Sequence, residues 1–140
     1  MGLDMYALRV ADGGARPMPD VDAKFTSDSR AFDDEGNPLY RIIKRKFFYW
    51  RKHPALHVWM KRLYEKKGGL SREFNCDNVR LTFRDLDALE ATVNRSELPY
   101  PAGFIFDPSS SDRRDEDLGF IKRARAAIAE GDAIYYTGWW

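Results

Sequence analysis

The chain has 140 residues, of which 44% are hydrophobic and 14% aromatic, and its formal net charge is +1. These values predict one folded domain spanning residues 1–140 and exclude an intrinsically disordered protein. The single cysteine, Cys76, excludes an intramolecular disulfide and a multi-cysteine zinc site. No apolar run approaches the roughly 18 residues of a membrane span, and the N-terminus lacks a secretion signal, so we expect a cytoplasmic protein.

The first quarter of the chain combines a strand with an acidic loop. Loose alternation of apolar residues predicts a strand over residues 3–10, ended by the turn sequence Asp12-Gly13-Gly14. Residues 12–38 are rich in proline, glycine and acidic side chains, and only a short strand is expected there, around residues 23–27. We interpret residues 12–38 as a long acidic surface loop.

The middle of the chain is basic and aromatic. β-Branched and aromatic residues predict a strand from Leu39 to Tyr49, ending near Trp50. Pro54 suits the first turn of a helix that continues to Lys67, where Gly68-Gly69 ends it. Ten bases and one acid lie between residues 41 and 67, in contrast to six acids and two bases between residues 20 and 35.

The C-terminal half alternates strands and helices. Residues 78–81 and 103–106 are expected strands, and Thr82 opens a capping-box pattern for a helix ending near Asn94. A third helix is expected over residues 114–130 and a last strand over residues 133–136. The predicted fold is therefore α+β, with a mostly antiparallel sheet of four to five strands and three helices packed mainly on one side.

Few residues in the sequence indicate catalysis or metal binding. His53 and His57 are four residues apart, but Pro54 places His53 outside the helix, so a structural or ligand-binding role is expected for His57 rather than zinc ligation. Asp4 lies in an apolar strand, where an ionised carboxylate needs a partner such as Arg51, Lys52 or His57 unless it faces solvent. No phosphate-binding loop or nucleophile motif is present, and no cofactor is expected.

The block from Lys44 to Lys52 interleaves cations with aromatic rings. Cations bind phosphates and aromatic faces stack on bases, as in sites for nucleotides or single-stranded nucleic acid. The other interpretation is an ordinary strand with rings toward the core and bases in solvent. A strict two-residue period leaves both open, because Phe47 and Tyr49 then share a face with Arg51, and Phe48 and Trp50 share one with Lys46 and Lys52.

Four segments resemble a family of short phage and prophage proteins, some of which carry a mistaken phosphoglycerate kinase label. They are residues 1–6 (MGLDMY), residues 49–52 (YWRK) with residues 56–59 (LHVW), residues 103–106 (GFIF) and residues 134–136 (IYY). The resemblance covers the whole chain except the acidic loop. It implies a small accessory protein of a phage, acting by binding, with counter-defence as one such role; it implies no enzymatic activity.

Together these observations predict a non-enzymatic protein that binds an anionic ligand, either a nucleotide or nucleic acid. The expected binding residues are Lys44, Lys46, Tyr49, Trp50, Arg51, Lys52, His57 and Asp4. An alternative is a protein-binding inhibitor of a host defence complex such as a CRISPR complex, acting through the basic helix. A weaker alternative is a small enzyme that uses Asp4, Arg51, Lys52 and His57.

Overall fold

The computed structural model describes residues 2–11, 18–26, 41–99 and 113–140, with only the backbone described for residues 25, 26 and 41–45. Its elements in chain order are β1 (Asp4–Val10), β2 (Phe25–Thr26), β3 (Arg41–Arg51), α1 (Pro54–Lys66), β4 (Asn78–Leu81), α2 (Phe83–Asn94), α3 (Arg113–Ala129) and β5 (Ala133–Trp139). The strands form one sheet in the order β2-β3-β1-β5-β4.

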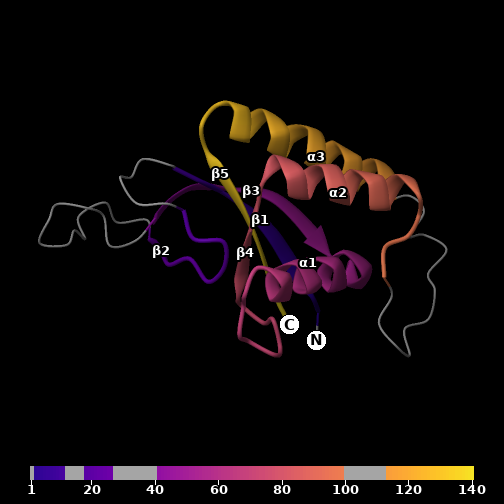
Figure 1. Cartoon of the computed structure of the whole chain (residues 1–140), viewed down its shortest axis with the longest axis horizontal. Helices are drawn as coiled ribbons and strands as arrows, with labels where there is room; N and C mark the ends of the chain where they lie inside the picture. The colour runs from indigo at the N-terminus through magenta and orange to yellow at the C-terminus, as the bar shows by residue number, and fades with distance from the viewer. Residues whose placement is uncertain (1, 12–17, 27–40, 100–112) are drawn as a thin grey trace, which may run out of the picture.

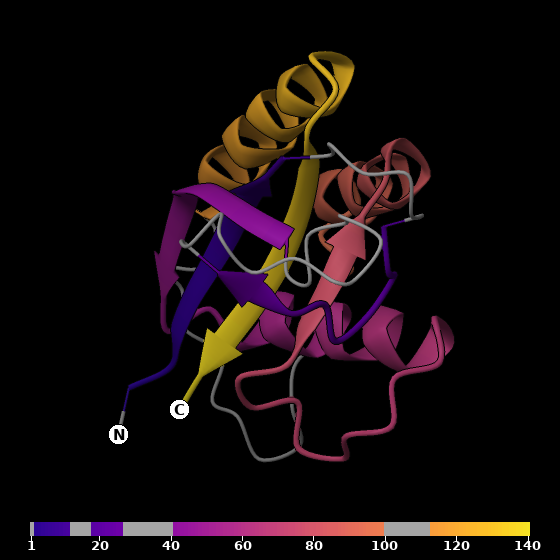
Figure 2. The same ribbon diagram turned by 90° about the vertical axis from the view of Figure 1, so that its left-hand side faces the viewer.

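The predicted α+β class is confirmed. Strand β1 lies at the centre, antiparallel to both β3 and β5, and β4 is antiparallel to β5; only the short β2 pairs in parallel, with β3. The three helices lie on one side of the sheet (Figure 1), and Figure 2 looks onto the other side. The expected strand over residues 103–106 and most of the acidic loop fall outside the described residues.

The main core fills the space between the sheet and the helices. Its largest fully buried side chains include Trp50 from β3, Met60 from α1, Leu86 from α2, Phe120 from α3 and Tyr136 from β5. Burial of side chains this size stabilises the fold by about 1.5–3 kcal/mol each. Every helix contributes to this core, which explains why the predicted apolar helix faces were recognisable in the sequence.

A β-bulge in β3 decides which of its aromatic residues enter the core. Ala7 of β1 pairs with Phe48, whereas Leu8 pairs with Lys46, so Phe47 is an extra residue in the ladder. Phe47 and Phe48 consequently both pack on Phe120, with ring centroids 6.2 and 5.3 Å away. The strict two-residue period assumed from the sequence therefore breaks at Phe47.

The helix-free side of the sheet carries a smaller apolar cluster. Leu8, Val10 and Tyr135 pack there against Met18 and Ala23. Two hydrogen bonds of 2.9 Å join the Asn78 side-chain amide to the Ala23 backbone, and the Tyr135 hydroxyl donates to the Pro19 carbonyl. These contacts hold residues 18–23 against one half of this face. Figure 2 shows the segment crossing the strands.

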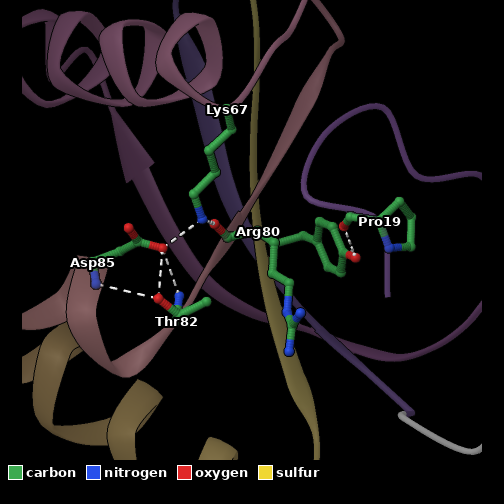
Figure 3. A network of polar contacts seen from close by, with 6 residues as sticks. Pro19, Lys67, Arg80, Thr82 and Asp85 are labelled. Carbon is green, nitrogen blue, oxygen red and sulfur yellow. Dashed lines mark hydrogen bonds and ion pairs between the residues drawn. The ribbon is translucent and has the colours of Figure 1, made fainter. Parts of the chain in front are cut away.

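A polar network joins the end of α1 to the start of α2 (Figure 3). The predicted capping box is confirmed: the Thr82 hydroxyl accepts from the Asp85 amide, and the Asp85 carboxylate accepts from the Thr82 amide. The Lys67 ammonium donates to the Asp85 carboxylate at 2.5 Å and to the Arg80 carbonyl at 2.6 Å. None of the helices in the described ranges combines the length and apolar character that crossing a bilayer requires.

Candidate ligand-binding platform

The other half of the helix-free face presents aromatic rings from three adjacent strands. Tyr6 of β1 pairs directly with Tyr49 of β3, and Trp139 of β5 lies on the diagonal from Tyr6, because Trp139 pairs with Asp4. The Tyr6 ring centroid is 5.1 Å from that of Tyr49 and 5.4 Å from that of Trp139. We call these three residues the ring platform.

The ring platform is open to solvent on its outer side. Tyr49 retains 46% of its surface exposed and Trp139 retains 45%, whereas Tyr6 between them is half-buried. Large rings exposed together are unusual, since aromatic side chains normally contribute most to stability when buried. A patch of this kind is typical of a binding surface.

A lysine lies on the faces of the platform rings. The Lys46 ammonium is 4.7 Å from the ring centroid of Tyr6 and 5.5 Å from that of Trp139. Both distances allow attraction between the cation and the ring electrons, worth about 0.5–1 kcal/mol at an exposed position. Lys46 therefore supplies a positive charge to the surface that the rings form.

Asp4 lies at the other end of the platform. The Tyr49 hydroxyl donates a 2.6 Å hydrogen bond to Asp4 Oδ1, and this bond is the main reason why the pKa of Tyr49 is raised. Tyr49 is therefore protonated at neutral pH and acts as a hydrogen-bond donor. The expected partners of Asp4 were Arg51, Lys52 or His57, and the structure gives Tyr49 instead.

The prediction that Trp50 is a ligand-binding residue is wrong. Trp50 has no exposed surface, and its indole Nε1 donates to Asp117 Oδ1 of α3 at 3.2 Å. His53 Nε2 is 2.9 Å from the other oxygen of the same buried carboxylate. Trp50 thus belongs to a buried polar network that joins the end of β3 to α3, because it pairs with Met5, whose side chain lies in the same core.

His57 lies on the opposite side of the sheet from the ring platform. Its Nδ1 is hydrogen-bonded to the Tyr136 hydroxyl at 2.7 Å, and its ring contacts those of Phe74 and Trp140. Burial, with a smaller contribution from Lys61, lowers the pKa of His57 to about 4. The ring is therefore neutral near pH 7. Its surroundings fit a structural role, and no group of three potential metal-ligating side chains occurs among the described residues.

The remaining predicted cations are divided between regions. Arg51 and Lys52 are exposed at the end of β3. Arg51 follows Tyr49 by two residues and therefore lies on the same side of the sheet as the platform. Lys52 adopts a positive φ of 52° and donates its amide to the Leu3 carbonyl, which marks the turn into α1. The Lys44 side chain lies outside the described residues.

The residues proposed for an enzyme do not converge. Asp4 is bonded to Tyr49 on the helix-free face, whereas the His57 ring packs on the helix side of β5, where a Cβ on Gly138 would be 3.0 Å from its Nδ1. The sheet separates the two side chains. This combination therefore provides no acid–base pair.

Sequence reasoning missed two platform residues, Tyr6 and Trp139. Tyr6 follows Asp4 by two residues, and this spacing puts both on one face of a strand. Trp139 lies beyond the expected end of the last strand at Tyr136, whereas β5 continues to Trp139. The alternation of Tyr135, Thr137 and Trp139 is the signal that would have shown the same outward face.

A separate cavity of about 810 Å³ lies between α1 and α2. Its charged lining mixes bases with acids, namely Arg62, Lys66, Lys67 and Arg84 with Asp20, Asp85 and Glu97. Lys67 and Asp85 neutralise each other as an ion pair. The bases of α1 thus border a region of mixed charge away from the platform. The basic block of the sequence is therefore divided between the platform face of the sheet and the helix side.

Comparison with known proteins adds no identification: no family model, curated protein or solved structure matches the chain.

Proposed function

We propose that the protein binds a nucleotide or a single-stranded nucleic acid on the ring platform. The observation that carries this proposal is the cluster of Tyr6, Tyr49 and Trp139 on the helix-free face, with the Lys46 ammonium at its surface. Antiparallel sheets that bind single strands use the same combination of exposed rings and cations.

The rings supply affinity that does not depend on sequence. A base stacked on an aromatic side chain contributes about 1–3 kcal/mol, because every base has an apolar π face that stacking removes from water. Tyr6 is flanked by a ring on each side, so the platform extends across three strands. This width suits one or two bases.

Lys46 makes a phosphate favourable beside the base. Its ammonium lies over the ring faces of Tyr6 and Trp139, so a base that stacks on these rings would displace it. The displaced cation loses its ring contacts and gains a phosphate partner if the ligand is a nucleotide. Arg51, exposed on the same strand, provides a second cation for a longer strand. A neutral nucleoside offers no such compensation and is expected to bind more weakly.

The biological setting follows from the resemblance to short phage and prophage proteins. A small phage protein that binds a nucleotide signal or single-stranded nucleic acid would withhold it from host enzymes. We therefore propose an accessory, non-catalytic role of this kind. Binding of nucleotides or nucleic acid favours counter-defence as that role.

The direct test is a titration of the full chain with nucleoside 5′-monophosphates and with short single-stranded DNA and RNA at low salt. Trp139→Leu keeps an apolar side chain but removes the stacking ring, and we expect it to weaken binding about tenfold or more. Binding is measured by calorimetry, since fluorescence would also report the other tryptophans.

Trp140→Leu is the matched control. Trp140 is the neighbouring residue and is equally exposed at 45%, but its ring contacts His57 on the helix side. Affinity should be unchanged in this variant. Absence of binding to every probe at low salt, or equal losses in the two variants, would contradict the proposal.

A further inference from the structure

The polar end of the ring platform bears a carboxylate with a fixed orientation. Tyr49 and Asp4 occupy neighbouring strands, and the 2.6 Å bond from the Tyr49 hydroxyl reaches Asp4 Oδ1. Among the described residues no donor is bonded to Oδ2. That oxygen is therefore available to a ligand that lies on the rings.

Within the described residues, the carboxylate forms no ion pair with Arg51 on the neighbouring strand. Arg51 is the cross-strand partner of Asp4, yet no ion pair joins the two side chains in the described part of the chain. The backbone of Lys46 lies toward the opposite end, since Lys46 pairs with Leu8, which follows Asp4 and Tyr6 on the same face of β1. The platform thus carries a carboxylate beside Arg51 at one end, while the Lys46 ammonium reaches from the other end over the rings of Tyr6 and Trp139.

We propose that Asp4 selects guanine among the bases that stack on the ring platform. This inference rests on the proposed function and specifies the ligand of the same site. A stacked nucleotide would direct its phosphate toward Lys46 and its base edge toward Asp4, because the reverse orientation places phosphate against a carboxylate.

The chemistry of base edges explains the choice of guanine. A carboxylate only accepts hydrogen bonds, and guanine presents two adjacent donors, N1–H and the N2 amino group, on its Watson–Crick edge. Adenine and cytosine each place an acceptor beside their amino group, and uracil flanks its single N–H with two carbonyls. These three edges bring a lone pair against the carboxylate, whereas guanine donates to both carboxylate oxygens, since Oδ1 has a second lone pair besides the one that accepts from Tyr49.

The test compares guanosine, inosine, adenosine, cytidine and uridine 5′-monophosphates by calorimetry with the full chain. We expect guanosine monophosphate to bind about tenfold more tightly than the adenosine, cytidine and uridine compounds. Inosine monophosphate keeps N1–H but lacks the amino group, so its affinity should be intermediate.

Two variants separate the role of the carboxylate from that of the rings. Asp4→Asn has the same shape and should abolish the guanine preference while binding that depends on Trp139 persists. Tyr49→Phe keeps the ring but removes the hydroxyl that positions Asp4, and we expect it to reduce the preference several-fold. Thermal unfolding checks that each variant is folded. If Asp4→Asn does not fold, the guanine preference of Tyr49→Phe and the ratio of inosine to guanosine monophosphate affinity still test the role of Asp4.

The outcomes distinguish the two proposals. Equal binding of all five compounds, or an unchanged guanine preference in Asp4→Asn, would overturn the inference about Asp4 and leave the binding platform intact. No binding of any of the five compounds would overturn the inference about Asp4, whereas the proposed function fails only if short single-stranded DNA and RNA do not bind either.

Discussion

At the scale of single residues, His57 shows how burial fixes a protonation state. Its ring lies among Phe74, Tyr136 and Trp140, and burial disfavours the charged form. The neighbouring Lys61 adds a repulsive positive charge, which the backbone of Phe74 offsets in part. His57 is therefore expected to couple the stability of the fold to pH.

We expect the protein to lose stability as the pH falls from about 6.5 to 4. The folded-state pKa of His57 is about 4 and the ordinary value is 6.5, so between these values the unfolded chain binds more protons than the folded one. The free energy of unfolding is fully retained above pH 6.5 and should decrease by about 2–3 kcal/mol on approach to pH 4.

Urea unfolding at a series of pH values measures this effect. His57→Asn retains a hydrogen-bonding group near Tyr136 but does not titrate, so its stability should vary much less between pH 4.5 and 6.5. An identical pH dependence in the variant and the unaltered protein would show that another group is responsible.

At the scale of elements, the capping box of α2 is reinforced by a partly buried ion pair. Asp85 accepts from the Thr82 amide and hydroxyl and from Lys67. Burial alone would raise the pKa of Asp85, but the hydrogen bonds from Lys67 and Thr82 outweigh it, and the pKa is lowered overall. One carboxylate thus joins the start of α2 to the end of α1.

We expect Thr82→Ala to reduce the free energy of unfolding by about 1 kcal/mol, because the Asp85 amide loses its acceptor at the helix start. Thr92→Ala in the same helix is the control. The Thr92 hydroxyl donates only to the Ala88 carbonyl one turn earlier, and this carbonyl also belongs to the helix ladder. Chemical denaturation should show a change within about 0.5 kcal/mol for the control. Equal effects of the two substitutions would contradict the role of the cap.

At the scale of the whole molecule, the arrangement of charge matters more than its total. The bases between residues 41 and 67 form one run in the sequence, but β3 carries Lys46 and Arg51 to the platform, whereas α1 carries Arg62 and Lys66 to the cavity beside α2. Only the first pair lies on the face with the exposed rings.

This separation predicts different salt effects for two variants of equal net charge. Lys46→Gln with Arg51→Gln should weaken binding of a short single-stranded oligonucleotide and reduce the slope of log affinity against log salt concentration by about 1–2. Arg62→Gln with Lys66→Gln should leave both quantities unchanged. If the α1 variant has the larger effect, the oligonucleotide binds at the cavity rather than on the platform.

The sequence by itself determined the class of fold and most of its elements. Period-three-to-four apolar spacing, Pro54 at a helix start and the Thr82–Asp85 pair are local signals, because the interactions that they represent form within a few residues of chain. The predicted binding block also contained Lys46, Tyr49 and Arg51, and these three residues are exposed in the structure.

Tertiary structure alone decided which aromatic residues form the site. The extra residue at Phe47 is visible only once β3 is paired with β1, and it turns Phe47 into the core and places Lys46 on the outer face with Tyr49. Tyr6, Tyr49 and Trp139 are far apart in sequence and meet because β1 lies between β3 and β5. Pairing between distant strands sets this arrangement, and no local pattern encodes it.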